Sequence, residues 1–318
     1  MDRIEVLANH LGPSNYKSNL LPITFELYKS NLIVVNTYEN GCIEIQLTNP
    51  RKNIITEDIF KELIMILEYI YKLKSVKLVL LTSKNQYYFG CGVNKGDIAS
   101  INKLERLIQQ FPKPVISFID GFVSDAGLGV SFLCTFRIVS ERAVFSTHQY
   151  IESSPQFDTG SLLIWSKLKS QGLYTILTGC ELNSADLLKI GVATHFMKSS
   201  NFSKAIEELS TNSYIDSIKE ISRILKCHSI ILKNLNDLSS LHHVKDLIET
   251  YYSWNYESVD EIIEKMEKES NNLLNSNEEL NWINSNLKNL KAFNRKYLYN
   301  TFQAIHFCNR SNKILNFK

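Results

Sequence analysis

The chain lacks the features that announce a disulfide-rich, metal-binding or membrane protein. Its six cysteines are scattered over 318 residues, with no CxxC pair and no cysteine and histidine at metal-ligand spacing. They fit small buried hydrophobes in a reducing compartment, and the sequence predicts neither a disulfide framework nor a metal site or cofactor. No apolar run reaches the roughly 18 residues of a membrane span, so no membrane partner is predicted.

An excess of one charge is also absent. The chain has 35 basic and 33 acidic residues, a net charge of +2. This balance excludes a strongly basic composition typical of nucleic-acid-binding proteins, although it allows a few phosphate contacts. The first thirty residues include Asp2, Glu5 and Glu26 and a single arginine. They match neither an Arg-rich mitochondrial presequence nor a secretory signal.

What the sequence does contain is enough apolar material for a large core. Hydrophobic residues make up 44% of the chain, which fits one domain of about 200 to 250 residues plus an extension. Apolar runs predict a hairpin over 32–48, with its turn at Glu39–Gly41, and strands at 76–82, 115–119, 137–140, 143–146 and 193–196. Helical periodicity or composition predicts helices from Thr56 and at 102–110, 161–168, 173–178, 183–189, 202–210, 215–225, 259–267 and 280–302.

This alternation predicts an α/β fold. We expect an N-terminal extension over 1–30, a core over 31–199 and a helical C-terminal region over 200–318. Within the core, the stretch 111–137 carries the most chemical information. A strand at Val115–Ile119 ends at a glycine turn and leads into a buried helix start at Gly127. Free amides at such a helix start can stabilise developing negative charge.

Three sequence blocks carry a family resemblance: VKLVLLTSKNQYYFGCGVNKGDI, KPVISFIDGFVSDAGLGVSFLCTFRIVSERAVFS and LTGCELNSADLLKIGVATHF. In this order they resemble the crotonase (enoyl-CoA hydratase/isomerase) superfamily, and most of all its 3-hydroxyisobutyryl-CoA hydrolase branch. The resemblance runs from about residue 32 to 196 and resumes weakly at 258–268 and 282–291. It implies a crotonase-type spiral of ββα turns followed by a helical C-terminal region.

The resemblance implies an oxyanion hole made of two backbone amides. The first follows Phe89–Gly92, but Val93-Asn94-Lys95 are extra residues before the matching Gly96, so the donor is Gly96 or Val93. The second falls on Ala126, where the family has the middle one of three glycines. Its β-carbon stands where a thioester would approach, and the carboxylate of Asp125 opposes the developing negative charge.

The resemblance places Gln149 where the hydrolase branch has its acid/base glutamate. Glutamine cannot accept and return a proton, so that role is lost unless Glu152 or His148 replaces it. Asp158 matches a retained family aspartate. It is either a remaining catalytic group or an ordinary cap of the helix that follows.

The C-terminal region offers two further candidate surfaces. Tyr251, Tyr252, Trp254 and Tyr256 are an interaction surface or, as we expect, core packing between helices. No acidic residue occurs from Lys288 onward, and aromatics interleave with the basic residues there. This stretch is either a contact to RNA phosphates or a solvated helix face. His242 and His243 lack further metal-ligand partners in sequence.

Together these substitutions predict a degenerate, non-catalytic protein that acts as a structural or interaction subunit. The hydrolase branch includes a protein of the mitochondrial ribosome's small subunit, so the resemblance implies a mitochondrial location. Its implied partners are mitochondrial ribosomal proteins, with ribosomal RNA contacted by the basic C-terminal stretch. The alternatives are an active 3-hydroxyisobutyryl-CoA hydrolase or hydratase with an acyl-CoA substrate, and a CoA-binding module without chemistry.

Overall fold

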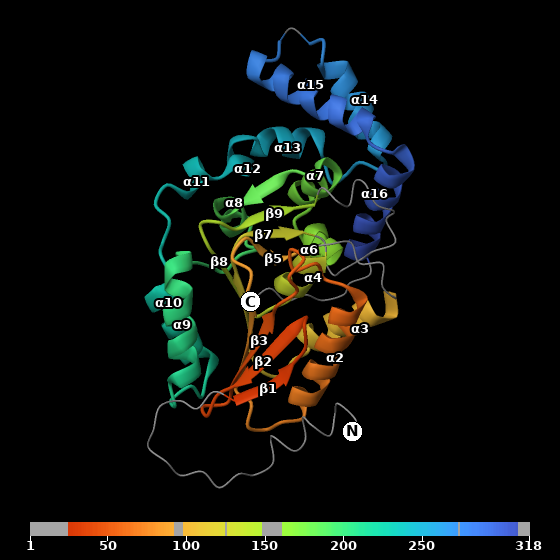
Figure 1. Cartoon of the computed structure of the whole chain (residues 1–318). Helices are drawn as coiled ribbons and strands as arrows, with labels where there is room; N and C mark the ends of the chain where they lie inside the picture. Colours follow the sequence, from red (N-terminus) through yellow and green to blue (C-terminus); the bar gives the residue numbers. More distant parts are fainter. Residues whose placement is uncertain (1–24, 92–97, 125, 148–160, 273, 311–318) are drawn as a thin grey trace.

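The computed structural model describes residues 25–91, 98–124, 126–147, 161–272 and 274–310. Within these ranges the strands form two sheets joined by short turns (Figure 1). The large sheet has seven strands in the order β1-β2-β3-β4-β6-β8-β11. Their bounds are Phe25–Lys29, Ile33–Thr37, Cys42–Leu47, Leu78–Ser83, Val115–Ile119, Phe136–Val139 and His195–Phe196. The first three strands pair antiparallel, and the pairs from β3 to β11 are parallel.

The small sheet has four strands in the order β10-β9-β7-β5, again counting the described residues. Their bounds are Glu181–Asn183, Val144–Ser146, Phe122–Ser124 and Tyr88–Gly90. Strands β4, β6 and β8 of the large sheet each continue through a short turn into β5, β7 and β9 of the small one. A helix follows each step, which gives the repeated ββα turns of the predicted spiral and confirms the predicted α/β class.

The helices of the core are α2 (Glu57–Tyr71), α3 (Ile98–Gln109), α4 (Ala126–Phe132), α6 (Ser161–Lys167), α7 (Ser170–Thr178) and α8 (Ser184–Lys189). The predicted cap of α2 is confirmed, because the Thr56 side chain accepts a hydrogen bond from the Ile59 amide. The apolar residues at helical spacing, Ile59, Leu63, Ile66 and Ile70, are all buried. They form the core-facing side of α2.

The continuous apolar run of β4 is explained by burial on both faces of the sheet. Val79 and Leu81 belong to the main core, on the side of α2 and α4. Leu78 and Leu80 belong to a second core, with Leu209 of α9 and Leu225 of α10. Helices α9 (Ser199–Thr211) and α10 (Ile218–His228) therefore cover the opposite face of the large sheet (Figure 1).

The rest of the C-terminal region is helical, as predicted. Its helices are α11 (Leu235–Leu238), α12 (Ser240–His243), α13 (Lys245–Tyr251), α14 (Val259–Glu269), α15 (Asn277–Ala292) and α16 (Arg295–Arg310). The buried Asp186 of α8 accepts hydrogen bonds from the Ser239 hydroxyl at 2.8 Å and the Leu241 amide at 2.9 Å. This carboxylate joins the core to the start of α12 in the C-terminal region.

Two expectations need correction. Residues Phe25–Lys29, placed in the irregular extension, form β1 at the edge of the large sheet. The helix expected over 280–302 is two helices, because Phe293 is extended and the Asn294 side chain accepts a hydrogen bond from the Tyr297 amide at 3.2 Å. Asn294 thus starts a new helix. The division at residues 30 and 199 stays a prediction. No helix among the described residues combines the length and apolarity of a membrane span.

Candidate oxyanion-hole scaffold

Two glycines beside the segments expected to supply oxyanion amides meet in the structure. Gly90, at the end of β5, lies against Gly127 in the first turn of α4. A β-carbon added at Gly127 would stand 2.1 Å from the Gly90 carbonyl oxygen, which no side chain can do. The two backbones can approach this closely only because residue 127 is glycine. The fold therefore brings together the end of one ββ turn and the helix start of the next.

Ala126 occupies the first position of α4, one residue before the expected helix start at Gly127, and is fully buried. It follows Ser124, the last residue of β7, whose hydroxyl is also buried. Within the described part of the chain, the Ser124 Oγ has no hydrogen-bond partner. A buried hydroxyl without a hydrogen bond costs stability. This turn therefore contains a polar atom that does not help to hold the described fold together.

The turn before α2 fixes the other side of this junction, and the sequence reading missed it. Asn53 is buried and has a left-handed backbone, with φ of 47°. Its side-chain nitrogen, Nδ2, donates hydrogen bonds to the Ser83 hydroxyl at 2.6 Å and to the Tyr88 carbonyl at 3.1 Å. The Ile55 amide then donates to the Cys91 carbonyl at 2.6 Å. These bonds hold β5 at its exit, just before the expected donor loop. An asparagine near a turn was the available signal, since Asn tolerates this conformation.

The other predicted site residues fall outside the described residues. These are Val93, Gly96, Gln149 and Asp158, together with the substitute candidates His148 and Glu152. Their roles stay predictions.

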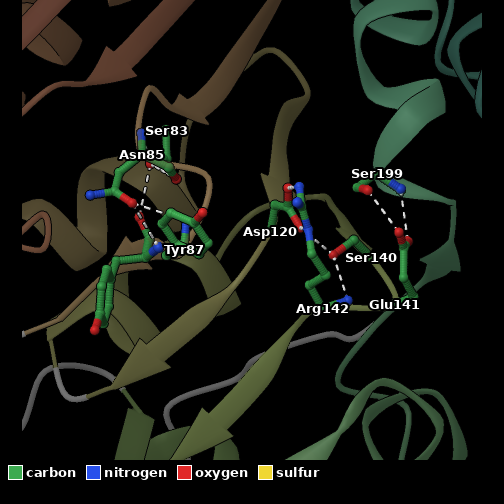
Figure 2. A network of polar contacts seen from close by, with 9 residues as sticks. Ser83, Asn85, Tyr87, Asp120, Ser140, Glu141, Arg142 and Ser199 are labelled. Atoms are coloured by element: carbon green, nitrogen blue, oxygen red, sulfur yellow. Dashed lines mark hydrogen bonds and ion pairs between the residues drawn. The ribbon is translucent and has the colours of Figure 1, made fainter.

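A second polar cluster lies at the carboxyl ends of β6 and β8 (Figure 2). Asp120 accepts a hydrogen bond from the Ser140 hydroxyl at 2.5 Å and one from the Arg142 Nε at 2.9 Å. The bond to Asp120 is the main reason why the pKa of Arg142 lies above its ordinary value. This ion pair ties the turn after β6 to the turn after β8.

Glu141 in the same cluster ties the core to α9. Its carboxylate accepts hydrogen bonds from the Ser199 amide at 2.8 Å and the Ser199 hydroxyl at 2.7 Å (Figure 2). Desolvation of the carboxylate favours the neutral acid, but the two bonds from Ser199 outweigh this effect and hold the pKa of Glu141 below its ordinary value. All charged groups of this cluster are partnered, which fits a structural role better than a reactive one.

The aromatic residues of the C-terminal region are core packing, as expected. Tyr251 and Tyr252 are buried, and their hydroxyls donate to Glu279 at 2.9 Å and Asn286 at 3.0 Å. Trp254 stacks on His306 with ring centroids 4.2 Å apart.

The basic C-terminal stretch has less uncompensated positive charge than its sequence suggests. Lys291 pairs with Glu267 at 2.7 Å and Arg295 with Asp260 at 2.6 Å, both acids coming from α14. Two of its cations are therefore compensated across a helix contact that the linear sequence does not reveal.

The cysteines and histidines in the described part of the chain form no cluster of potential metal ligands. All six cysteines are thiols. Cys42, Cys91 and Cys134 are buried, in line with the expectation, whereas Cys227 on α10 is exposed. No group of three or more potential metal ligands occurs among the described residues.

Comparison with known proteins agrees with this architecture. The sequence profile of a family described as "Enoyl-CoA hydratase/isomerase" matches residues 42–316. The chain is similar in structure to a carnitinyl-CoA dehydratase from Mycobacterium thermoresistibile, with a TM-score of 0.72 and 20% identity over 88% of this chain and 81% of that one. An enoyl-CoA hydratase from Rhodobacter sphaeroides gives a TM-score of 0.69 at 18% identity, over 86% of this chain and 78% of that one. At these identities the likeness concerns the fold.

Curated relatives divide between two roles. The "Small ribosomal subunit protein mS47" of Arabidopsis thaliana is 30% identical over 61% of this chain and 45% of its own length. The "3-hydroxyisobutyryl-CoA hydrolase-like protein 1, mitochondrial" of the same organism is 28% identical over 58% of this chain and 44% of its own length. Each match thus spans less than half of the relative.

Proposed function

Because the chain belongs to the enoyl-CoA hydratase/isomerase (crotonase) family, we propose that it keeps the family's fold but not its reaction, and serves as a structural subunit. The assembly that we propose is the small subunit of the mitochondrial ribosome. The similarity to two proteins named mS47, from Arabidopsis thaliana and Neurospora crassa, supports this choice. The names of several hydrolase-like relatives place them in mitochondria, which supports the same location for this chain.

The residue that carries the proposal is Gln149, which the family resemblance places where the hydrolase branch has its acid/base glutamate. An amide has nearly the shape of a carboxyl group but cannot take up and return a proton at neutral pH. The central step of thioester hydrolysis therefore loses its general acid/base. Ala126 adds to this, because its β-carbon narrows the approach to the amide that would hold the oxyanion. Both changes leave the scaffold in place.

Sedimentation tests the ribosomal role. The tagged full chain, expressed in its own cells, is expected to sediment with small ribosomal subunits from lysed mitochondria in a sucrose gradient. It should remain with them at a salt concentration that removes loosely bound proteins. A chain found only in the soluble fractions at the top of the gradient would refute the proposal.

The second candidate is an active 3-hydroxyisobutyryl-CoA hydrolase, and the close contact of Gly90 with Gly127 favours it. In that case the amides of Gly96 and Ala126 would hold the thioester oxyanion, while Asp158 handled protons with Glu152. The purified chain would then release free CoA from 3-hydroxyisobutyryl-CoA. Turnover that is lost in Asp158→Asn would establish this reading; we expect no turnover in the wild type, in Asp158→Asn or in Glu152→Gln.

A further inference from the structure

We propose that two clefts at the amino ends of β4 and β6 form a single surface that binds the phosphate backbone of RNA. The choice of RNA among polyanions rests on the proposed ribosomal role. The surface itself rests on the charge and geometry described below.

The first cleft lies between α2 and α3 and has a volume of about 860 Å³. Lys72, Lys103 and Arg106 line it together with a single acid, Glu68. The second cleft, of about 280 Å³, lies where the strands meet the start of α10. Its described lining repeats this balance, with three lysines, Lys74, Lys77 and Lys113, and one acid, Asp216.

The two clefts adjoin each other along two chain segments. Lys72 lines the first and Lys74 the second, two residues further along the turn after α2. Gln110 lines the first and Pro112 the second, in the turn after α3. One ridge of backbone therefore separates two grooves that share a rim.

The described linings of both clefts together carry six basic and two acidic residues, a net charge of +4. The whole chain carries only +2. Both acids are already used, because Glu68 pairs with Lys103 at 2.7 Å and Asp216 with Lys77 at 2.8 Å. Lys72, Lys74 and Arg106 are exposed and have no acidic partner among the described residues. Uncompensated cations along a groove attract a regularly charged polyanion and release its counterions.

An aromatic ring stands at the rim of the first cleft. The Tyr71 side chain is 50% exposed, and Phe111 contacts its ring edge-on at a centroid distance of 6.0 Å. A ring held in place beside cations suits an unpaired base that stacks on it. A lipid surface would instead call for several exposed apolar side chains, and the described linings offer few besides Tyr71 and Ile218.

The surface is also separate from the oxyanion-hole scaffold. It lies at the amino ends of the parallel strands, and Gly90 and Gly127 lie beyond their carboxyl ends. The six residues of β4 alone span roughly 20 Å. The turn after α2 lies at the lower end of the view in Figure 1, and the small sheet lies above it. Changes to these cations should therefore leave any acyl-CoA chemistry untouched.

Fluorescence anisotropy with a labelled RNA stem-loop tests the surface on the purified full chain. The triple variant Lys72→Gln, Lys74→Gln, Arg106→Gln is expected to bind at least tenfold more weakly at low salt. The slope of log affinity against log salt concentration is negative, and its magnitude should decrease by roughly 2 to 3, since each lost phosphate contact removes about 0.7 to 0.9. The matched control removes three exposed lysines elsewhere, Lys198→Gln, Lys204→Gln and Lys233→Gln, and should bind as the wild type does.

Three results would overturn the inference: equal loss in the control triple, no loss in the cleft triple, or cleft-dependent binding to phosphatidylserine vesicles or coenzyme A but not to RNA. Tyr71→Ala should weaken RNA binding about fivefold or more, and Tyr71→Phe should not. Thermal unfolding confirms that each variant is folded.

Sedimentation with ribosomal subunits separates this inference from the proposed function. If the wild type and the cleft triple sediment equally with small subunits, and both bind the stem-loop equally, the surface is wrong while the ribosomal role stands. If the wild type does not sediment with ribosomes, but the stem-loop still distinguishes the cleft triple from the control, the ribosomal role is wrong and the surface stands.

Discussion

At the carboxyl ends of β4, β6 and β8 the backbone itself is packed, whereas at the amino ends of β4 and β6 long charged side chains lie over open grooves. The carboxyl end depends on contacts such as Gly90 with Gly127, and its charged groups Asp120, Arg142 and Glu141 are all partnered. The amino end holds cations without acidic partners among the described residues.

This difference separates backbone contacts, which the fold requires, from surface charges, which substitutions can change. A backbone contact without side chains cannot be adjusted by small substitutions, so it constrains the scaffold whatever side chains line the site. Surface cations contribute little to folding and can be gained or lost freely. The comparison predicts large stability effects at the carboxyl end and small ones at the amino end.

The largest effect is expected for Gly127→Ala. The new methyl group would stand 2.1 Å from the Gly90 carbonyl oxygen, and a backbone atom cannot move aside as a side chain can. The free energy of unfolding should fall by about 3 kcal/mol, the upper part of the range for overpacking. Urea denaturation measures it.

Gly90→Ala is the matched control on the other side of the same contact. Its β-carbon would meet the Gly127 Cα and the Ile55 Cδ1 at 3.3 Å, one of which belongs to a flexible side chain. We expect a loss of about 1 kcal/mol, at the low end of the same range. Equal losses for the two variants would show that the backbone contact is not what limits this site.

Asn53→Ala should have the next largest effect. It removes the donor to Ser83 and Tyr88 inside the core and places alanine at a φ of 47°. We expect a loss of about 2 to 3 kcal/mol from unsatisfied acceptors and backbone strain together. Asn53→Gly, which relieves only the strain, should be more stable than Asn53→Ala by about 1 kcal/mol. If Asn53→Gly were no more stable than Asn53→Ala, backbone strain would not explain the loss.

Sequence reasoning predicted the elements that local patterns specify. The run of β4 and the capped periodicity of α2 leave few alternatives. The buried helix start expected at Gly127 lies one residue after the observed start of α4 at Ala126. It missed β1, because an edge strand such as Phe25–Lys29 shares its pattern with irregular chain. It also missed the helix start at Asn294, where a side-chain cap interrupts an apolar pattern that continues on both sides.

The site needed tertiary information. Gly90 and Gly127 are distant in sequence, so their contact follows from the spiral rather than from either motif. The two clefts combine residues of α2, α3 and the start of α10, and a chain-wide charge of +2 cannot reveal such a local excess. The C-terminal stretch illustrates the reverse: a segment without acids finds Asp260 and Glu267 on another helix.

At the amino end, Asp216→Asn should cost no more than about 0.5 kcal/mol. The Lys77–Asp216 pair is largely exposed, and exposed pairs gain little beyond the entropy that they lose. Lys77→Gln and the double variant complete the cycle and isolate the pair. A coupling energy well above 1 kcal/mol would show that this end is as rigidly built as the other, and the comparison would fail.

The smallest effect, and the sharpest in its dependence on pH, concerns Glu141. Its pKa is lower in the folded chain than its ordinary value of 4.5, chiefly because two hydrogen bonds from Ser199 outweigh the opposing effect of burial. A depressed carboxyl pKa stabilises the fold at pH values above the unfolded pKa, and this stabilisation disappears as the pH falls through the folded pKa. Glu141 is exposed, so the contribution should not exceed about 0.5 kcal/mol.

Urea midpoints at neutral pH and at acid pH, below the folded pKa, measure this contribution. Glu141→Gln and Ser199→Ala should both lower the midpoint at neutral pH and should approach the wild type in acid. Ser200→Ala, which removes the neighbouring exposed hydroxyl, should match the wild type at both pH values. A loss that persists undiminished in acid would mean that the Ser199 contact acts through helix geometry rather than through the charge of Glu141. The charge of Glu141 would then contribute nothing at the carboxyl end, and the difference from the charged amino end would be sharper still.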